Sequence, residues 1–257
     1  MCLIINKPEK ITLPGKKQLR KAFETNSDGA GLAIRDKERW IVSKGYMVFS
    51  DLMRGIKEYK DINDREVILH FRMGTSGLDK PGNTHPFPIS DDTDELRALD
   101  YSAPWIAAHN GILGQGQYEK GKGMLTDTQV YIRDVLANPI ILKGLTENIG
   151  STIEILKYTI NGDKLIIGGP KHTILIGNWQ EKNGCFYSNL YWNRKTTDWS
   201  KWIGGYDSKQ YFRGKSMTWE DEDMIRCKAC NQMTYDLTIN MCACGYSEED
   251  VLLLKGN

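Results

Sequence analysis

Cys2 stands directly behind the initiator methionine, a position at which a cysteine can act as a catalyst. If Met1 is removed, Cys2 carries both a thiol and a free α-amino group. An α-amine has a reference pKa of roughly 7.7–8.0, so part of it is neutral near pH 7 and can accept a proton. The residue would then supply its own nucleophile and base, as N-terminal threonine nucleophiles do. In the structural alternative, Met-Cys-Leu-Ile-Ile begins a buried strand and Cys2 serves as a small apolar residue.

Two segments further along carry side chains that could bind a ligand or take part in catalysis. In His70–Gly77, Arg72 offers a planar fork of donors that suits a carboxylate, and Thr75 adds a hydroxyl. The second segment, Asn83–Phe87, places His85 before a proline. Each also has an ordinary interpretation: Arg72 could form a surface ion pair, and His85 could be a packed loop histidine.

A third segment, Ala107–Gly111, ends a predicted strand with Asn110 and Gly111. An asparagine amide beside a glycine backbone N–H provides two donors that can converge on one oxygen, as in an oxyanion hole. Asn-Gly is also a common turn sequence. The functional interpretation therefore depends on the combination of segments.

Four of the six cysteines lie close together near the C-terminus. Cys227 and Cys230 form a Cys-x-x-Cys pair, and after eleven intervening residues Cys242 and Cys244 form a Cys-x-Cys pair. Two close thiolate pairs can enclose a tetrahedral Zn²⁺. Four sulfur ligands leave no open coordination position, so we expect this zinc to be structural. An iron–sulfur site and free thiols are the alternatives.

The bulk properties exclude some classes of protein. The 257 residues include 34 Lys+Arg and 33 Asp+Glu, so the net charge of +1 creates no overall attraction to nucleic acid or membrane. No apolar run approaches the roughly 20 residues that span a bilayer, and the N-terminus does not resemble a secretory signal. We expect a cytoplasmic protein whose cysteines stay reduced or bind metal.

Apolar periodicity predicts short strands at both ends of the main domain with helices between them, which indicates an α+β fold. The last three predicted strands follow one another as antiparallel neighbours. The predicted strands are Leu3–Ile5, Gly31–Arg35, Arg39–Ser43, Glu66–Phe71, Trp105–Ala108, Lys164–Ile167, Thr173–Ile176 and Cys185–Tyr187. The predicted helices are Gly15–Thr25, Asp51–Tyr59, Thr126–Leu136 and Pro139–Asn148.

Composition suggests three regions: a main domain over residues 1–192, an aromatic-rich linker over 193–223 and a small zinc-ribbon-like domain over 224–257. The linker's rings either pack onto the main domain or form a stacking surface for nucleic acid, because basic residues alternate with the aromatics.

Taken together and in this order, the segments resemble the class II glutamine amidotransferases, N-terminal-nucleophile enzymes that hydrolyse the side-chain amide of glutamine. The resemblance covers roughly residues 2–190 and implies an α+β fold, a four-layer αββα Ntn-hydrolase sandwich, with a small zinc ribbon behind it. The segments that match are Cys2, Asn26–Gly31, His70–Arg72 with Thr75, Asn83–Phe87, His109–Gly111 and Thr126–Thr128.

The resemblance implies a role for each matching residue in the reaction. Cys2 attacks the amide carbon, and its own α-amine takes and returns the proton. Asn110 and the backbone N–H of Gly111 hold the tetrahedral oxyanion. A γ-glutamyl thioester forms, ammonia leaves, and water then releases glutamate.

Glutamine binding is implied for three further residues. Arg72, helped by Thr75, binds the α-carboxylate, and Asp127 binds the α-ammonium. This division agrees with the charges of an amino acid, which needs a cation and an anion placed apart.

Most members of the family fuse the glutaminase to a synthase domain that uses the ammonia. We expect no such domain after residue 190 and find no P-loop, so the ammonia is expected to pass to a separate synthetase. Acidic runs at Glu220–Asp223 and Glu248–Asp250 favour a protein partner over DNA, although nucleic acid binding stays open. The alternatives are a hydrolase of other γ-glutamyl amides and a non-catalytic binding module that uses the zinc ribbon.

Overall fold

The computed structural model describes residues 2–74, 80–113, 125–193, 224–226 and 233–235. The chain divides into two compact units, Met1–Lys195 and Thr196–Asn257. The described part of the second unit is an antiparallel pair of strands, β12 (Met224–Arg226) and β13 (Met233–Tyr235). The predicted linker, apart from its first residue, and most of the predicted zinc ribbon lie outside the described residues.

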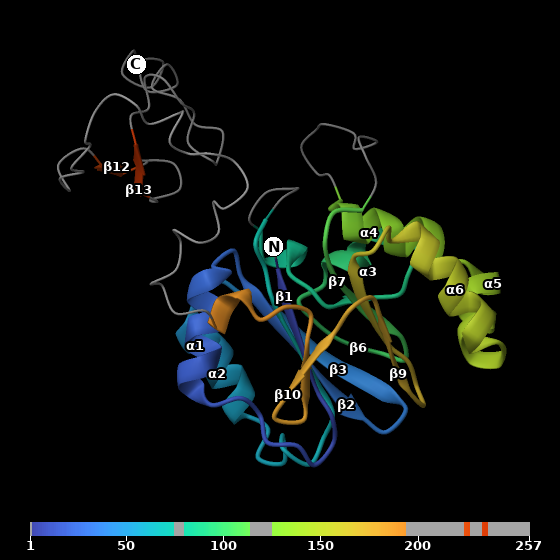
Figure 1. The fold of residues 1–257 in the computed structure, drawn as a ribbon, viewed down its shortest axis with the longest axis horizontal. Helices are drawn as coiled ribbons and strands as arrows, with labels where there is room; N and C mark the ends of the chain where they lie inside the picture. Colours follow the sequence, from blue (N-terminus) through green and yellow to red (C-terminus); the bar gives the residue numbers. More distant parts are fainter. Residues whose placement is uncertain (1, 75–79, 114–124, 194–223, 227–232, 236–257) are drawn as a thin grey trace, which may run out of the picture. The chain divides into compact units, whose positions relative to one another are not determined.

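The first unit contains two antiparallel sheets (Figure 1). The larger sheet has seven strands in the order β10-β11-β1-β4-β2-β3-β6, and the smaller has four in the order β5-β7-β8-β9. The strands of the larger sheet are β1 (Leu3–Lys7), β2 (Ala30–Asp36), β3 (Arg39–Tyr46), β4 (Val67–Phe71), β6 (Asp100–Ala103), β10 (Gln180–Lys182) and β11 (Cys185–Tyr187). Those of the smaller sheet are β5 (Phe87–Pro88), β7 (Ile106–Asn110), β8 (Lys164–Gly168) and β9 (Thr173–Ile176).

Helices connect the strands of the first unit, and short 3₁₀ turns occur at Pro81–Asn83 and Tyr191–Asn193. The α4 helix continues into a π-helical turn at Ile132–Leu136. None of the helices in the described ranges is both long and apolar enough to cross a membrane. The helices are α1 (Lys16–Thr25), α2 (Phe49–Lys57), α3 (Thr93–Arg97), α4 (Asp127–Tyr131), α5 (Pro139–Glu147) and α6 (Ile149–Thr159).

Three apolar clusters hold these elements together, and each cluster lies between two layers of the fold. The first joins α1 and α2 to one face of the larger sheet. The second joins α4, α5 and α6 to one face of the smaller sheet. The third consists of side chains from the facing surfaces of both sheets, including Trp40 of β3 and Ile166 of β8, and it joins the two sheets directly. The observed architecture is therefore mixed α+β with two facing antiparallel sheets, in agreement with the predicted α+β class.

The β1 strand shows why its sequence is an uninterrupted apolar run. Leu3 and Ile5 belong to the cluster under α1 and α2, whereas Ile4 belongs to the cluster between the sheets. Successive side chains of a strand point to opposite faces, so a strand covered on both sides needs apolar residues at consecutive positions. Burial on both faces fixes the register of β1, because a slip by one residue would exchange its two faces.

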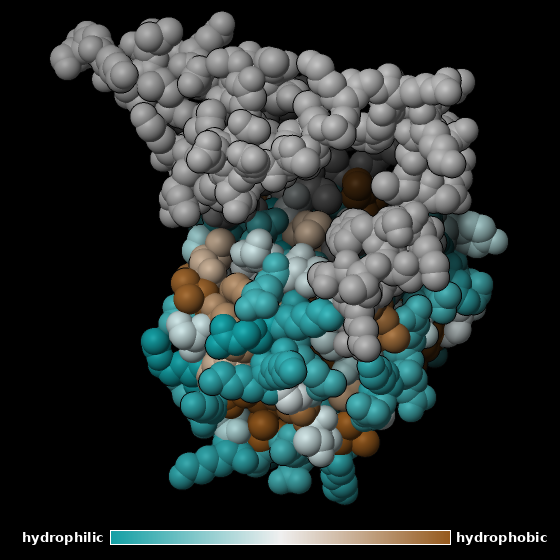
Figure 2. Space-filling view, turned by 60° about the vertical axis from the view of Figure 1, so that its left-hand side comes forward, coloured by the Kyte–Doolittle hydropathy of each residue, from teal (hydrophilic) through white to brown (hydrophobic). Residues whose placement is uncertain are grey.

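The surface side of α1 is hydrophilic. Leu19 and Phe23 of α1 face the core, while Lys16, Lys17 and Arg20 on the same helix are exposed. Figure 2, turned toward this side of the molecule, shows mainly hydrophilic residues with small separated hydrophobic areas.

Most predicted elements are confirmed, but the short elements α3, β5, β6 and β10 were not predicted, and two further differences concern β11 and α6. The prediction that Cys185–Tyr187 continues the antiparallel series of the two preceding strands is wrong, because β11 lies in the larger sheet and pairs with β1 through Ile5 and Tyr187. The α6 helix was not predicted. Its first turn contains Gly150, Ser151 and Thr152, which have lower helix propensity than Ala or Leu, so packing rather than local preference accounts for this helix.

Replacing Ile166, buried between the sheets, by alanine should reduce the free energy of unfolding by about 2–5 kcal/mol, because the change leaves a cavity that neither sheet can fill. Chemical denaturation checks this. The matched control is Ile155→Ala on α6, where the side chain is 54% exposed and the change should stay within about 0.5 kcal/mol. Equal losses in both variants would contradict the proposed packing between the sheets.

Candidate functional site

The register between β1 and β4 positions Cys2. Leu3 pairs with Phe71 and Ile4 with His70. The same register, continued by one residue before β1, brings Cys2 opposite Arg72. Alternation along the strand also places Cys2 on the same side as Ile4, which faces the second sheet. The thiol is therefore directed toward the gap where the two sheets meet, and Cys2 lines a pocket there.

Backbone atoms of Met73 contact the Cys2 thiol. Sγ lies 3.3 Å from the Met73 N–H, which donates to it, and 3.4 Å from the Met73 carbonyl, which accepts from the thiol. Burial raises the pKa of the Cys2 thiol, opposed in part by the Met73 backbone contact and by the positive charge of Arg72. The thiol is therefore protonated at neutral pH, and it needs a base before it can act as a nucleophile.

The turn at Asp28 and Gly29 holds the backbone that contacts this thiol. Asp28 Oδ2 accepts a hydrogen bond of 2.6 Å from the Gly74 N–H. Backbone bonds also run from Asp28 N–H to the Arg72 carbonyl (3.1 Å) and from Arg72 N–H to the Gly29 carbonyl (2.8 Å). Because the bonds flank Met73 on both sides, this early turn fixes the peptide groups around the thiol.

The end of β7 forms the opposite wall. Ile106 and Ala108 face the larger sheet, so alternation places Asn110 on that side as well. Gly111 follows and lines the pocket. A Cβ at Gly111 would lie 1.9 Å from Cγ of Asp163, so only glycine allows this approach. Oδ2 of Asp163 in turn accepts a 2.8 Å bond from the Ile112 N–H and fixes the turn.

Asn110 is buried, and its carboxamide contacts a residue that is distant in sequence. Its Nδ2 lies 2.9 Å from Oγ of Ser188, just after β11. Its Oδ1 is buried without a hydrogen-bond partner among the described residues.

A loop from Pro81 to Phe87 brings His85 into the pocket wall. A Cβ at Gly31 would lie 2.0 Å from the His85 carbonyl oxygen, so the loop packs directly on the β2 backbone. Nδ1 of His85 accepts a 3.2 Å bond from the His109 N–H, which leaves the proton of the neutral ring on Nε2. Buried Lys44 supports the same loop by donating to the Gly82 carbonyl at 3.1 Å.

His70 and His85 are neutral over the physiological range. Their rings stack with centroids 4.1 Å apart. Burial lowers the pKa of His70 to about 3, although its bond to the His109 carbonyl acts in the opposite direction. Burial also holds the pKa of His85 well below its usual 6.5, helped by the nearby charges of Arg72 and Lys44. The pair therefore serves as a fixed polar wall and not as an acid or base at neutral pH.

Asp127 enters the pocket at the start of α4. Thr126 caps this helix, since its hydroxyl accepts from the Gln129 N–H (3.3 Å) and its N–H donates to Gln129 Oε1 (2.8 Å). The carboxylate of Asp127 accepts bonds from the N–H groups of Leu113 (3.0 Å) and Thr128 (2.8 Å). These bonds hold the carboxylate at the pocket surface.

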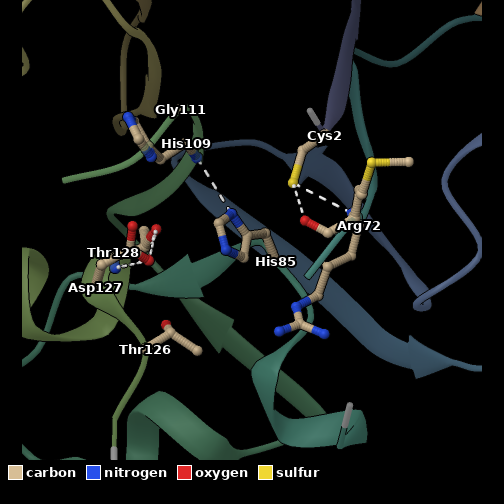
Figure 3. Close-up of a pocket in the computed structure, with 9 residues that line it drawn as sticks. Cys2, Arg72, His85, His109, Gly111, Thr126, Asp127 and Thr128 are labelled. Atoms are coloured by element: carbon tan, nitrogen blue, oxygen red, sulfur yellow. Dashed lines mark hydrogen bonds between the residues drawn. The ribbon is translucent and has the colours of Figure 1, made fainter. Parts of the chain in front are cut away.

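The pocket encloses about 290 Å³ of empty space, including its open mouth. Figure 3 shows Cys2 and Arg72 on one side, His85 between, and Asp127 on the opposite side, the side on which Gly111 also lies. A thiol, a guanidinium and a carboxylate thus face one small cavity. Its lining residues are Cys2, Arg72, Met73, His85, His109, Gly111, Thr126, Asp127 and Thr128.

The structure brings four residues selected from the sequence to one pocket: Cys2, Arg72, Gly111 and Asp127. Asn110 is adjacent to it and buried. Thr75 and the four predicted zinc ligands, Cys227, Cys230, Cys242 and Cys244, lie outside the described residues. Within the ranges that the structure describes, no group of three or more His, Cys, Asp or Glu side chains is arranged to hold a metal ion.

Sequence reasoning assigned no role to two residues near this site, Ser188 and Asn189. Asn189 Nδ2 donates a 2.8 Å bond to the carbonyl of Cys2, and Ser188 contacts Asn110. Their local sequence carries no signal for this, because their position depends on the pairing of β11 with β1.

No family model matches the chain, and the search of curated proteins found no match.

Nuclear magnetic resonance should show His70 and His85 as neutral Nε2–H tautomers from pH 8 down to pH 5. The same residues in the denatured chain should titrate near 6.5. Because both pKa values fall on folding, the unfolded chain binds protons first, and the histidine contribution to stability is lost as pH falls from about 6.5 toward 3. A midpoint near 6.5 for either ring in the folded protein would contradict the buried neutral pair.

Proposed function

We propose that this protein is the glutaminase component of a glutamine amidotransferase, with Cys2 as an N-terminal nucleophile. One observation carries the proposal: the Cys2 thiol faces a small pocket that presents the guanidinium of Arg72 and the carboxylate of Asp127 on opposite sides. An amino acid carries a carboxylate and an ammonium group, and these two side chains are complementary to them. The substrate class that follows is an α-amino acid whose own side chain reaches the thiol.

The chemistry at the thiol is acyl transfer. Sγ of Cys2 forms a bond to the amide carbon of glutamine, and the carbonyl π electrons move to oxygen. The α-amine of Cys2 takes the thiol proton and delivers it to the departing nitrogen, so that ammonia leaves and a thioester remains. Water then adds to the thioester, releasing glutamate and restoring the thiol.

A separate base is necessary because burial raises the pKa of the Cys2 thiol. The buried rings of His70 and His85 are held neutral with very low pKa values, so neither suits this role at pH 7. A free α-amine, with a reference pKa of roughly 7.7–8.0, does suit it. The proposal therefore requires removal of Met1.

Gly111 supports the proposal from the opposite wall. Its backbone follows buried Asn110, and the two residues are the proposed donors to the oxyanion. Asp163 fixes the turn by accepting the Ile112 N–H. A preorganised donor pair of this kind stabilises charge without rearranging during the reaction.

The packing supports an Ntn-hydrolase sandwich as the fold. Helices cover the outer face of each sheet, and a third cluster joins the two inner faces. The order helices, sheet, sheet, helices is the order that a four-layer αββα sandwich requires. The pocket lies where the ends of β1, β4 and β7 meet.

A separate synthetase is proposed as the acceptor of the ammonia. Met73 and Ile112 directly follow Arg72 and Gly111 in sequence, and their side chains are 37% and 64% exposed. Exposed apolar side chains beside a polar pocket suit contact with a protein partner.

Intact-mass analysis before and after treatment with 6-diazo-5-oxo-norleucine, a glutamine analogue, tests the function. Attack by Cys2 would form an S–C bond and release dinitrogen. We expect loss of Met1 and a single adduct on the wild-type protein, with none on Cys2→Ala. The adduct rate should rise with pH through roughly 7.7–8.0, where an α-amine loses its proton. An unassisted thiol would react only at higher pH, because burial raises the pKa of Cys2.

The matched control is Cys185→Ala, since Cys185 is the other cysteine of the first unit and is buried in the core. This variant should still form the adduct. Retained Met1, or an unlabelled protein with a processed terminus, would reject the proposed nucleophile.

For the second unit we propose a structural zinc site formed by Cys227, Cys230, Cys242 and Cys244, on the basis of their spacing. Elemental analysis should find about one zinc per chain, because four thiolates complete a tetrahedral site. Cys227→Ser should lose the metal, while Cys2→Ala should retain it. Iron in place of zinc, or no metal in freshly purified protein, would contradict this proposal.

A further inference from the structure

Two residues that follow β11 contact the backbone of Cys2 and of Ile4, two residues further along the chain. Ser188 exchanges two hydrogen bonds with Ile4: the Ile4 N–H donates to Ser188 Oγ at 2.9 Å, and the Ser188 N–H donates to the Ile4 carbonyl at 3.0 Å. Asn189 Nδ2 donates to the Cys2 carbonyl at 2.8 Å. The start of β1 therefore pairs with β4 along one edge and is hydrogen-bonded to Ser188 and Asn189 along the other edge.

The same Ser188 hydroxyl reaches the other sheet. Its Oγ lies 2.9 Å from the carboxamide of Asn110 at the end of β7, and both residues are buried. One oxygen atom therefore links the strand that carries the nucleophile to the strand that carries the proposed oxyanion donor.

The donors and acceptors around this oxygen determine how the Asn110 carboxamide is oriented. With Nδ2 toward Ser188, Oγ receives two N–H donors and its own proton has no acceptor among the described residues, while Asn110 Oδ1 is left buried and unpaired. A carboxamide has nearly the same shape after a 180° rotation of its end group, so its partners decide the orientation. After rotation, the Ser188 hydroxyl donates to Oδ1 and the unpaired position is occupied by NH₂.

The geometry points to Ser188 as a positioning residue for the reaction: its hydroxyl donates to Asn110 Oδ1 and so presents the Asn110 NH₂ group, beside Gly111, as a donor to the oxyanion. This inference rests on the proposed glutaminase function and deepens it. The NH₂ group gains an acceptor only when a substrate oxygen becomes an oxyanion next to it. Ser188 thus acts through Asn110 and does not itself touch the substrate.

The linkage explains why one residue can set both position and orientation. Ser188 holds Ile4 two residues after Cys2, and it holds Asn110 one residue before Gly111. Reacting groups must be aligned closely, since a displacement of about 1 Å can cost roughly 100-fold in rate. A shared contact fixes the strand of the thiol relative to the proposed oxyanion donor.

A double-mutant cycle on the full chain tests this role. Ser188→Ala should lower kcat for glutamine hydrolysis by roughly 10- to 100-fold, which does not exceed the loss expected when one oxyanion donor is removed. KM should change by less than about 3-fold. Ser188→Thr keeps the hydroxyl and should recover most of the rate. In an Asn110→Ala background, Ser188→Ala should add less than about 3-fold, because the group it orients is already missing.

The buried hydroxyl of Thr152 in α6 is the control for general destabilisation. It donates to the Asn148 carbonyl at 2.9 Å. Thr152 does not line the pocket, so Thr152→Ala should leave kcat unchanged. Thermal unfolding of every variant measures whether the folded fraction is the same at the assay temperature.

Each other outcome rejects a specific part of the argument. An unchanged kcat in Ser188→Ala, or the same fractional loss with and without Asn110, would overturn the role of Ser188 while leaving the glutaminase intact. A rise in KM at constant kcat would assign Ser188 to substrate binding instead. A wild-type protein that does not hydrolyse glutamine would reject the proposed function itself, and the role of Ser188 with it.

Discussion

The pairing of β1 with β4 is the constraint on which the rest of the structure depends. Leu3 lies opposite Phe71 and Ile4 opposite His70, and β1 is covered by helices on one face and by the second sheet on the other. Since a slip of one residue would exchange the two faces, the hydrophobic effect holds this register. The register alone brings a cysteine at the start of one strand opposite an arginine at the end of another.

The interior next to the thiol is polar but largely satisfied by hydrogen bonds. His70 donates to the His109 carbonyl, His85 accepts from the His109 N–H, and Lys44 donates to loop carbonyls. In a buried region of low dielectric, such bonds are strong and unpaired groups are costly. The Oδ1 position at Asn110 has no hydrogen-bond partner among the described residues, nor do His70 Nδ1 and His109 Nε2, and the proposed reaction would give the Asn110 position a partner.

Burial has two opposing effects on the groups that line the pocket. It would strengthen the attraction of Arg72 and Asp127 for the proposed amino-acid substrate, and it also raises the pKa of the thiol that must lose its proton in the proposed reaction. A base attached to the cysteine itself resolves the conflict, because it needs no further charged residue in the wall. In this respect the proposed α-amine follows from the electrostatics of the pocket as well as from the position of Cys2.

The sequence alone determined the local elements and the types of residue at the site. The apolar run at Leu3–Ile5 predicts a buried strand, and Thr126 predicts the start of a helix, because both patterns depend on neighbouring residues only. Cys2, Arg72 and Gly111 could be selected for the same reason, since each stands in a short segment with recognisable chemistry, whereas Asp127 was selected only through the family resemblance. The α6 helix could not, since its first turn has low intrinsic propensity and packing compensates for it.

Only the tertiary structure decided which segments meet. Cys185–Tyr187 has the composition of any buried strand, and nothing in it indicates whether it joins β9 or β1. Its pairing with β1 is what brings Ser188 to Ile4, which is 184 residues away in sequence, and to Asn110, which is 78 residues away. The physical reason is that strand pairing and burial between sheets are collective: the free energy that selects a partner comes from the whole packed core, and a short sequence segment carries only its own share of it.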